Sequence, residues 1–158
     1  MSEPELETAN ERYRRRLLRN GFVLLLLALL TGIGIAANIF RNPREAVAAH
    51  LIGITDAALL GAVSAGWSLF ILSDGLKRLL FWSAVCGFYL GWGSNLLSAF
   101  FGTSRMTPIA GAGFTGLPWQ ENLVSAGLVI GAVLMVIMSI TAIWGLRAKL
   151  SFGSAERR

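Results

Sequence analysis

The chain has 158 residues, which is the length of one compact domain. Hydrophobic residues make up 54% of it and charged residues only 15%, whereas soluble domains carry about 25% charged residues. The formal net charge of +5 comes from Lys and Arg that flank long apolar runs, and no basic face with interleaved aromatic residues is present. This placement argues against a nucleic-acid-binding protein and predicts a protein of the lipid bilayer.

Residues 1–16 are polar and of mixed charge, and we expect a short cytoplasmic lead-in there that is partly helical near the membrane. The basic cluster Arg14-Arg15-Arg16 before an apolar run resembles a secretory signal. However, the run from Phe22 to Phe40 is long enough to cross a bilayer, and no convincing cleavage site follows it. We therefore predict an uncleaved first span over residues 17–40, which Asn42-Pro43 ends.

Three further spans are predicted, over residues 46–72, 79–102 and 121–146, with a turn at Ser73-Asp74-Gly75 between the second and third. A loop rich in Gly, Pro and Thr covers residues 103–120, and we expect its Gly111-Ala112-Gly113 segment to be flexible. Residues 17–150 are thus predicted to form an all-α, four-helix membrane domain, followed by a cytoplasmic tail over residues 151–158. In the second span, small residues recur every four positions and let a neighbouring helix approach closely: Ala49, Gly53, Ala57, Gly61 and Ala65.

The orientation follows from the basic residues. Eleven of the 14 Lys and Arg lie in the N-terminal region, the 73–78 turn and the C-terminal region. The other side carries only Arg41, Arg44 and Arg105. Because Lys and Arg are enriched in cytoplasmic segments, both termini are predicted to be cytoplasmic, in a multi-pass protein of a bacterial-type inner (plasma) membrane. Trp67, Trp82 and Trp144 are expected to form an aromatic belt at that boundary.

Polar side chains inside a bilayer are costly and need a reason. The predicted spans hold five of them, and Asn38 and Asn95 are expected to bond helices together. His50, the only histidine, either ligates a metal or haem iron or is hydrogen-bonded to a neighbouring helix. Asp56 lies about 120° around the same helix, so the two side chains flank a common cavity without touching. Tyr89 either bonds a backbone carbonyl or holds a substrate oxygen.

Several short motifs occur in a characteristic order, which runs from Asn42-Pro43-Arg44 and Ala49-His50-Leu51 to Met106-Thr107-Pro108-Ile109-Ala110 and Pro118-Trp119-Gln120-Glu121. This order resembles the hydroxylaminobenzene mutase family over nearly the whole chain, from about Arg15 to Leu146. It is similar, more distantly, to styrene oxide isomerase, in which the stretch that matches Gly87-Phe88-Tyr89-Leu90 carries a functional tyrosine.

The resemblance implies a homotrimeric membrane isomerase with haem b at the subunit interface and His50 as the axial ligand of the iron. It also implies that Tyr89 and the residue at position 56 hold the substrate. Styrene oxide isomerase has asparagine at that position, whereas this chain has Asp56, which donates a hydrogen bond only when protonated. Family members also tend to carry glycine after it, and here Ala57 follows.

The expected activity is an intramolecular rearrangement of an aromatic hydroxylamine or an aryl epoxide. Ferric haem acts as the Lewis acid, and Tyr89 and Asp56 are the catalytic residues. The expected partners are a small apolar aromatic substrate, the bilayer and further copies of the chain. One alternative is a non-enzymatic transporter or assembly subunit in which His50 and Asp56 form a polar relay. An electron-transfer haem protein is a weaker alternative, because it usually needs two axial ligands and each chain offers one histidine.

Overall fold

The computed structural model describes residues 3–147. Four long helices, α1 (Glu3–Ala36), α2 (Pro43–Ala65), α3 (Asp74–Phe101) and α4 (Pro118–Gly145), account for most of it, and the 3-10 helix η1 (Trp67–Leu69) follows α2. No strand occurs within residues 3–147, so the all-α prediction is confirmed. The predicted tail over residues 151–158 lies outside the described part of the chain.

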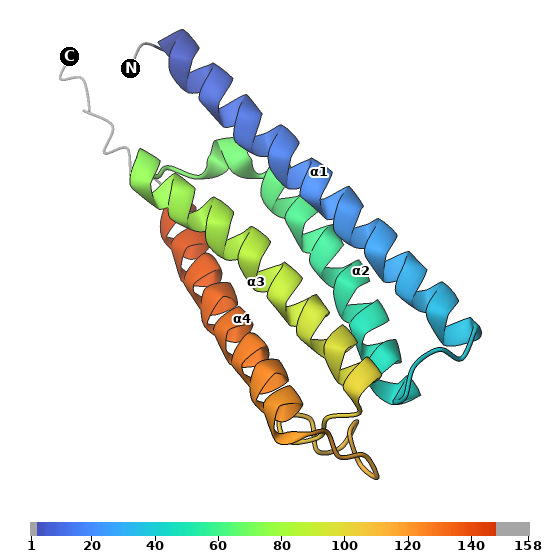
Figure 1. Cartoon of the computed structure of the whole chain (residues 1–158). Helices are drawn as coiled ribbons and strands as arrows, with labels where there is room; N and C mark the ends of the chain where they lie inside the picture. Colours follow the sequence, from blue (N-terminus) through green and yellow to red (C-terminus); the bar gives the residue numbers. More distant parts are fainter. Residues whose placement is uncertain (1–2, 148–158) are drawn as a thin grey trace, which may run out of the picture.

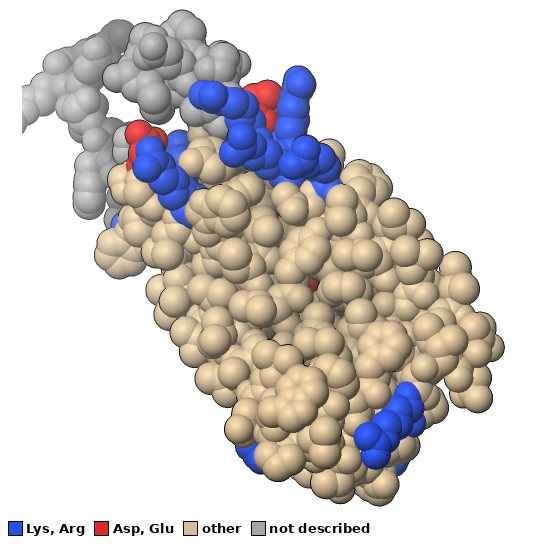
Figure 2. All heavy atoms as spheres, viewed as in Figure 1, with Lys and Arg blue, Asp and Glu red and all other residues tan. Residues whose placement is uncertain are grey.

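The helices lie side by side in chain order, so that α1 packs on α2, α2 on α3, and α3 on α4 (Figure 1). The start of α1 and the end of α4 lie at one end of the bundle, which we call the terminal end (Figure 1). The α1–α2 turn (37–42) and the connection between α3 and α4 lie at the other end, which we call the loop end (Figure 1). Figure 2 shows that basic side chains gather at the terminal end, above an extended body almost free of charged side chains, and that a few more lie at the loop end. The predicted orientation rests on the basic residues near both termini and in the 73–78 turn, and those of them within residues 3–147 lie at the same end of the bundle.

Each long helix contains a segment that is long and apolar enough to cross a membrane: Asn10–Ala36, Pro43–Ala65, Asp74–Phe101 and Pro118–Gly145. The four predicted spans are confirmed in number and order, but their boundaries differ. Helix α2 ends at Ala65 rather than at residue 72, because Gly66 caps it and η1 follows. Helix α1 is continuous from Glu3, so most of the predicted lead-in is helical.

The helix starts at the loop end follow from local sequence. The Asn42 side chain accepts hydrogen bonds from the amides of Arg44 and Glu45, and Pro43 occupies the first turn of α2. Pro118 opens α4 in the same way. Asn38 adopts a left-handed conformation with φ 54° just after α1, a conformation that asparagine tolerates better than most residues. Asn38 therefore belongs to the turn, and its predicted role in bonding membrane helices together is wrong.

The core lies between α1, α2 and α3. Trp67 is only 1% exposed and packs 5.1 Å from the ring of Tyr13, centroid to centroid. It is a core residue, so its predicted place in an aromatic belt is wrong, whereas Trp82 and Trp144 are exposed. The 3-10 helix η1, which no local sequence pattern predicts, places the Trp67 ring in this core.

The small-residue stripe of α2 brings its backbone close to α1 and α3. A Cβ built on Gly53 would lie 2.7 Å from Ala28 Cβ and 2.7 Å from Trp92 Cδ1. Across the same contact, a Cβ on Gly21 would lie 3.1 Å from the carbonyl oxygen of Ala57. The stripe ends before Gly61, whose Cβ position has no atom within 4 Å. Close packing of α1 on α2 thus puts α1 carbonyl groups within reach of α2 side chains.

Candidate active site

His50 projects from α2 onto α1. Its Nδ1 lies 2.7 Å from the carbonyl oxygen of Ala28. A carbonyl oxygen only accepts hydrogen bonds, so Nδ1 carries the hydrogen and the lone pair is left on Nε2. Gly32 makes room for the ring, because a Cβ there would lie 2.8 Å from His50 Cε1. A carbonyl that fixes the imidazole tautomer in this way is the usual partner of a metal-ligating histidine.

The surroundings of His50 suit a flat, apolar cofactor. The ring is half-buried, and nothing in the described part of the chain hydrogen-bonds to its Nε2. Residues next to it along both helices are exposed hydrophobic side chains: Leu29, Ile33, Val47 and Leu51. Residues 3–147 hold no group of three or more His, Cys, Asp or Glu that could bind a bare metal ion. Haem iron needs only one such side chain, so His50 matches the haem that the resemblance implies.

Asp56 projects from another side of α2. It is 7% exposed, and its Oδ2 has no hydrogen-bond partner among the described residues. It lines a cavity of about 600 Å³ between α2, α3 and α4. Gly91 of α3 leaves space beside the carboxyl group, with 3.9 Å between its Cβ position and Oδ2. A carboxyl group with a free oxygen, set in a mostly apolar cavity, is suited to hold or move a proton.

Asn95 lines the same cavity one turn of α3 away from Gly91. Its Nδ2 donates to the carbonyl oxygen of Gly91 at 2.8 Å. This bond lies within α3, so the side chain does not link helices, and the prediction that it would is wrong. Asn95 instead adds a second polar group to the cavity that Asp56 lines.

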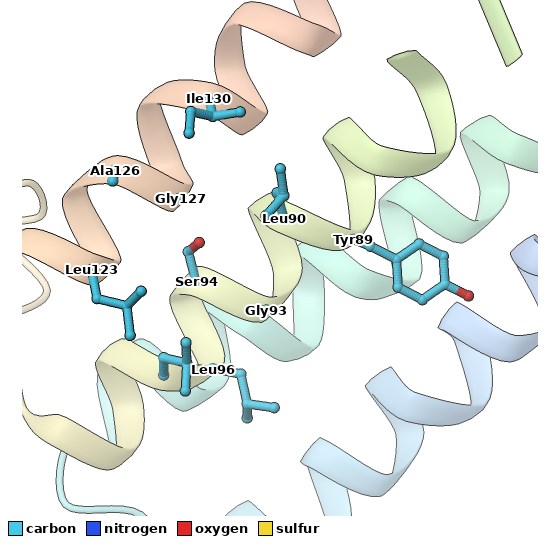
Figure 3. Close-up of a pocket in the computed structure, with 10 residues that line it drawn as sticks. Tyr89, Leu90, Gly93, Ser94, Leu96, Leu123, Ala126, Gly127 and Ile130 are labelled. Atoms are coloured by element: carbon cyan, nitrogen blue, oxygen red, sulfur yellow. The ribbon is translucent and has the colours of Figure 1, made fainter. Parts of the chain in front are cut away.

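Tyr89 projects from α3 toward α1. Its hydroxyl donates to the carbonyl oxygen of Asn20 at 3.1 Å. Tyr89 also borders a separate apolar groove of about 490 Å³ between α3 and α4, but its ring points away from the groove and toward α1 (Figure 3). Two roles were predicted for Tyr89, a bond to a backbone carbonyl or a contact with a substrate oxygen, and the bond to a backbone carbonyl is present in the structure.

The three predicted site residues do not share one cavity within a chain. His50 and Tyr89 both reach α1, but their carbonyl partners are eight residues apart, or about 12 Å along the helix. Asp56 faces the cavity on another side of α2, in agreement with the predicted angle between it and His50. His50 and the Asp56 cavity therefore lie on two different sides of α2.

Two buried carboxyl groups were missed by reasoning from sequence. Glu45 and Glu121 lie in the first turns of α2 and α4, where the helix dipole favours negative charge. Glu121 accepts hydrogen bonds from three loop amides at 3.1 Å, those of Ser104, Arg105 and Gly116. Glu45 accepts one from the Thr107 hydroxyl. The sequence signals their place in a first helical turn, because each glutamate closely follows a proline that starts a helix, but it does not signal their burial.

The motifs that carry the family resemblance therefore build the loop end as well as the His50 site. The Asn42 side chain donates to the carbonyl oxygen of Ala110 at 3.0 Å. Gly111 is buried, and a Cβ there would lie 2.5 Å from Ser104 Cα. Close packing thus requires glycine at position 111, whereas the Cβ position of Gly113 has no atom within 4 Å.

Comparison with known proteins agrees with this architecture. The family model described as styrene oxide isomerase matches residues 13–147. The chain is 38% identical over 135 residues to hydroxylaminobenzene mutase HabB of Ectopseudomonas oleovorans, which covers 85% of this chain and 81% of that protein. It is 34% identical over 110 residues to hydroxylaminobenzene mutase HabA of the same organism, with 69% and 80% covered. No solved structure matches the chain.

These relatives favour an enzyme over a transporter or an assembly subunit. Four apolar helices and a match along most of the chain further indicate a multi-pass membrane protein. The predicted family and the predicted isomerase class are both confirmed: the chain belongs to the styrene oxide isomerase family and is an isomerase.

Proposed function

We propose that this isomerase converts a hydroxylaminoarene into an aminophenol within a bacterial inner membrane, with both termini in the cytoplasm and haem b as its cofactor. The observation that carries the choice of substrate is Asp56, a buried carboxyl group with an unpartnered oxygen in a cavity. The names of two relatives, both hydroxylaminobenzene mutases, support the same choice.

The two candidate reactions differ in what they require of position 56. Rearrangement of a hydroxylaminoarene breaks the N–O bond, forms a C–O bond at a ring carbon, and moves a proton from that carbon to nitrogen. Rearrangement of an aryl epoxide to a carbonyl compound moves a hydride between carbons and transfers no proton through a base. A carboxylate can take the ring proton and return it to nitrogen, which an amide cannot do. Asp56 therefore suits the hydroxylaminoarene better than the epoxide.

His50 would hold the haem iron through Nε2, and the Ala28 carbonyl keeps that nitrogen unprotonated. When bound, ferric haem supplies a Lewis acid for the substrate oxygen. Because His50 and the Asp56 cavity lie on different sides of α2, we propose that a complete site takes His50 from one copy and Asp56 from a neighbour. We propose a trimer with the haem at each subunit interface. Tyr89 holds the substrate oxygen once its hydroxyl has left Asn20.

The first test combines an absorption spectrum with a turnover assay on detergent-purified protein. We expect a Soret band, conversion of hydroxylaminobenzene to 2-aminophenol, and slower or no conversion of styrene oxide. His50→Ala should lose both the band and the activity. A colourless, iron-free preparation with full activity would show that the haem proposal is wrong.

The second test replaces Asp56 by asparagine. Loss of a general acid–base group typically lowers turnover by 100-fold or more, so Asp56→Asn should slow hydroxylaminoarene conversion by about that factor. Any epoxide conversion should change much less. Asp74→Asn, at the start of α3 and outside the cavity, serves as the matched control. An equal loss with both substrates would mean that Asp56 binds substrate without transferring a proton.

A further inference from the structure

The cavity that Asp56 lines is bordered toward the loop end by the segment 102–117, which we call the cap. Met106 and Thr107 are the cap residues that line the cavity. The rest of its wall comes from α2, α3 and α4 and is mostly apolar. A volume of about 600 Å³ falls in the range of drug-sized ligands, whereas hydroxylaminobenzene is a single ring with one small group. The cavity therefore has room beyond the reacting group, and the cap borders it.

The cap is held firmly at both ends and along its length. Glu121 ties its two ends together through the amides of Ser104 and Gly116. Arg41 donates to the carbonyl oxygen of Phe101 at 2.8 Å, and Asn42 donates to that of Ala110. A wall fixed in this way can discriminate between substrates by shape, because it cannot move aside without breaking several hydrogen bonds.

Glu45 contacts Thr107, one of the two cap residues that line the cavity. It is 0% exposed, it accepts a hydrogen bond from the Thr107 hydroxyl, and its other carboxyl oxygen has no partner in the described part of the chain. No Lys or Arg among the described residues pairs with it. Burying a carboxyl group is costly, so this contact is a strong constraint on where Thr107 lies.

We infer that Met106 and Thr107 determine which ring substituents the enzyme accepts on its substrate. Glu45 is the positioning residue that holds these two side chains in place. This inference rests on the proposed function and deepens it. The substrate class becomes hydroxylaminoarenes with an apolar substituent or a fused second ring, whose far end lies against the cap.

The chemistry of the wall explains this selection. Met106 offers a flexible thioether that adapts to apolar groups. The hydroxyl hydrogen of Thr107 is already donated to Glu45, so Thr107 has a methyl group and an acceptor oxygen left to offer the cavity, but no side-chain donor. Asp56 and Glu45 are both acidic, and the cavity is lined by no Lys or Arg from the described residues. A substrate with an anionic ring substituent is therefore excluded, because its charge would be buried without a partner.

The test measures kcat and KM of purified, haem-loaded protein with three substrates: hydroxylaminobenzene, its 4-propyl derivative and its 4-carboxylate derivative. The wild type should accept the first two and reject the third. Met106→Trp, which shortens the cavity, should lower kcat/KM for the propyl derivative at least tenfold relative to hydroxylaminobenzene, mainly through KM. Ile109→Trp is the matched control, since Ile109 lies in the same cap but is 88% exposed and does not line the cavity.

The role of Glu45 is tested by rescue. Glu45→Leu removes the acceptor for Thr107. It should lower the ratio of kcat/KM for the 4-propyl derivative to kcat/KM for hydroxylaminobenzene below the wild-type ratio. Glu45→Gln keeps an acceptor oxygen and should restore the wild-type ratio. Thr107→Val should match Glu45→Leu, and combining the two should add no further change, because both remove the same contact. The substrate ratio is compared within each variant, so a loss of folded protein does not alter it.

Each outcome decides one point. If the wild type converts hydroxylaminobenzene but Met106→Trp leaves the substrate ratio unchanged, or Ile109→Trp shifts it equally, the inference about the cap is wrong while the proposed function stands. If Glu45→Leu keeps the wild-type ratio, Glu45 is not a positioning residue. If the wild type converts none of the hydroxylaminoarenes, both the proposed function and the inference about the cap are wrong.

Discussion

Replacing Gly32 by alanine tests how α1 prepares His50. The new Cβ would lie 2.8 Å from His50 Cε1 and 3.0 Å from Nδ1, closer than such atoms approach in proteins. The ring must therefore turn away from α1, and the 2.7 Å hydrogen bond from Nδ1 to the Ala28 carbonyl is lost. The Nε2 lone pair is then no longer fixed in direction.

The magnitudes show which measurement is sensitive. Losing the hydrogen bond costs about 1 kcal/mol, while replacing glycine by alanine inside a helix stabilises the helix by about 1 kcal/mol. These effects nearly cancel, so the melting temperature of the haem-free protein should change little. Removing the partner that orients a metal-ligating histidine lowers metal affinity by about 10-fold to 100-fold. Haem affinity, rather than stability, should therefore reveal the change at Gly32.

The assay is a titration of haem-free protein with haemin, followed by the Soret band, for the wild type and Gly32→Ala. Gly61→Ala is the matched control, because its Cβ position has no atom within 4 Å. It should keep wild-type haem affinity and gain the helix stabilisation. Wild-type haem affinity in Gly32→Ala would refute the reasoning that the Ala28 carbonyl orients the iron ligand.

Three further substitutions probe other parts of the structure. Tyr89→Phe should retain haem, lose about 1 kcal/mol of stability with its bond to α1, and lose most turnover; unchanged rates would remove Tyr89 from the mechanism. Glu121→Gln should weaken three amide hydrogen bonds and lower the free energy of unfolding by about 2 kcal/mol, seen as a lower melting temperature in detergent. Gly53→Ala should destabilise the bundle by about 1–3 kcal/mol, because its Cβ would lie 2.7 Å from Trp92 Cδ1; an unchanged melting temperature would contradict the close packing described above.

The helices were predictable because they depend on local properties of the chain. Long apolar runs, breaks at Asn42-Pro43 and Ser73-Asp74-Gly75, and the distribution of basic residues predict four spans in the right order. Boundaries were less predictable where tertiary contacts decide them. The apolar run beyond Ala65 predicts that the second helix continues. Instead Trp67 packs on Tyr13, and the 3-10 helix η1 replaces the α-helix there.

The polar residues were harder to assign from sequence. The angle between His50 and Asp56 follows from helix geometry, and the structure agrees with it. Which neighbour each side chain meets depends on how the helices pack, so neither the Ala28 carbonyl nor the cavity was foreseeable. The burial of Glu45 is not predictable from sequence, because a carboxylate near the end of a span usually faces water and its partner lies in a loop more than fifty residues away.

The arrangement of His50 and the Asp56 cavity on different sides of α2 also limits the symmetry of any assembly that completes the site. The surface that donates the imidazole differs from the surface that receives it, so the contact is head-to-tail. Such contacts close into a ring when the repeated rotation closes, whereas a two-fold dimer apposes each surface with its own copy. In such an assembly an isolated protomer would hold no complete site, a single contact would complete one site, and closure of the ring would complete the last.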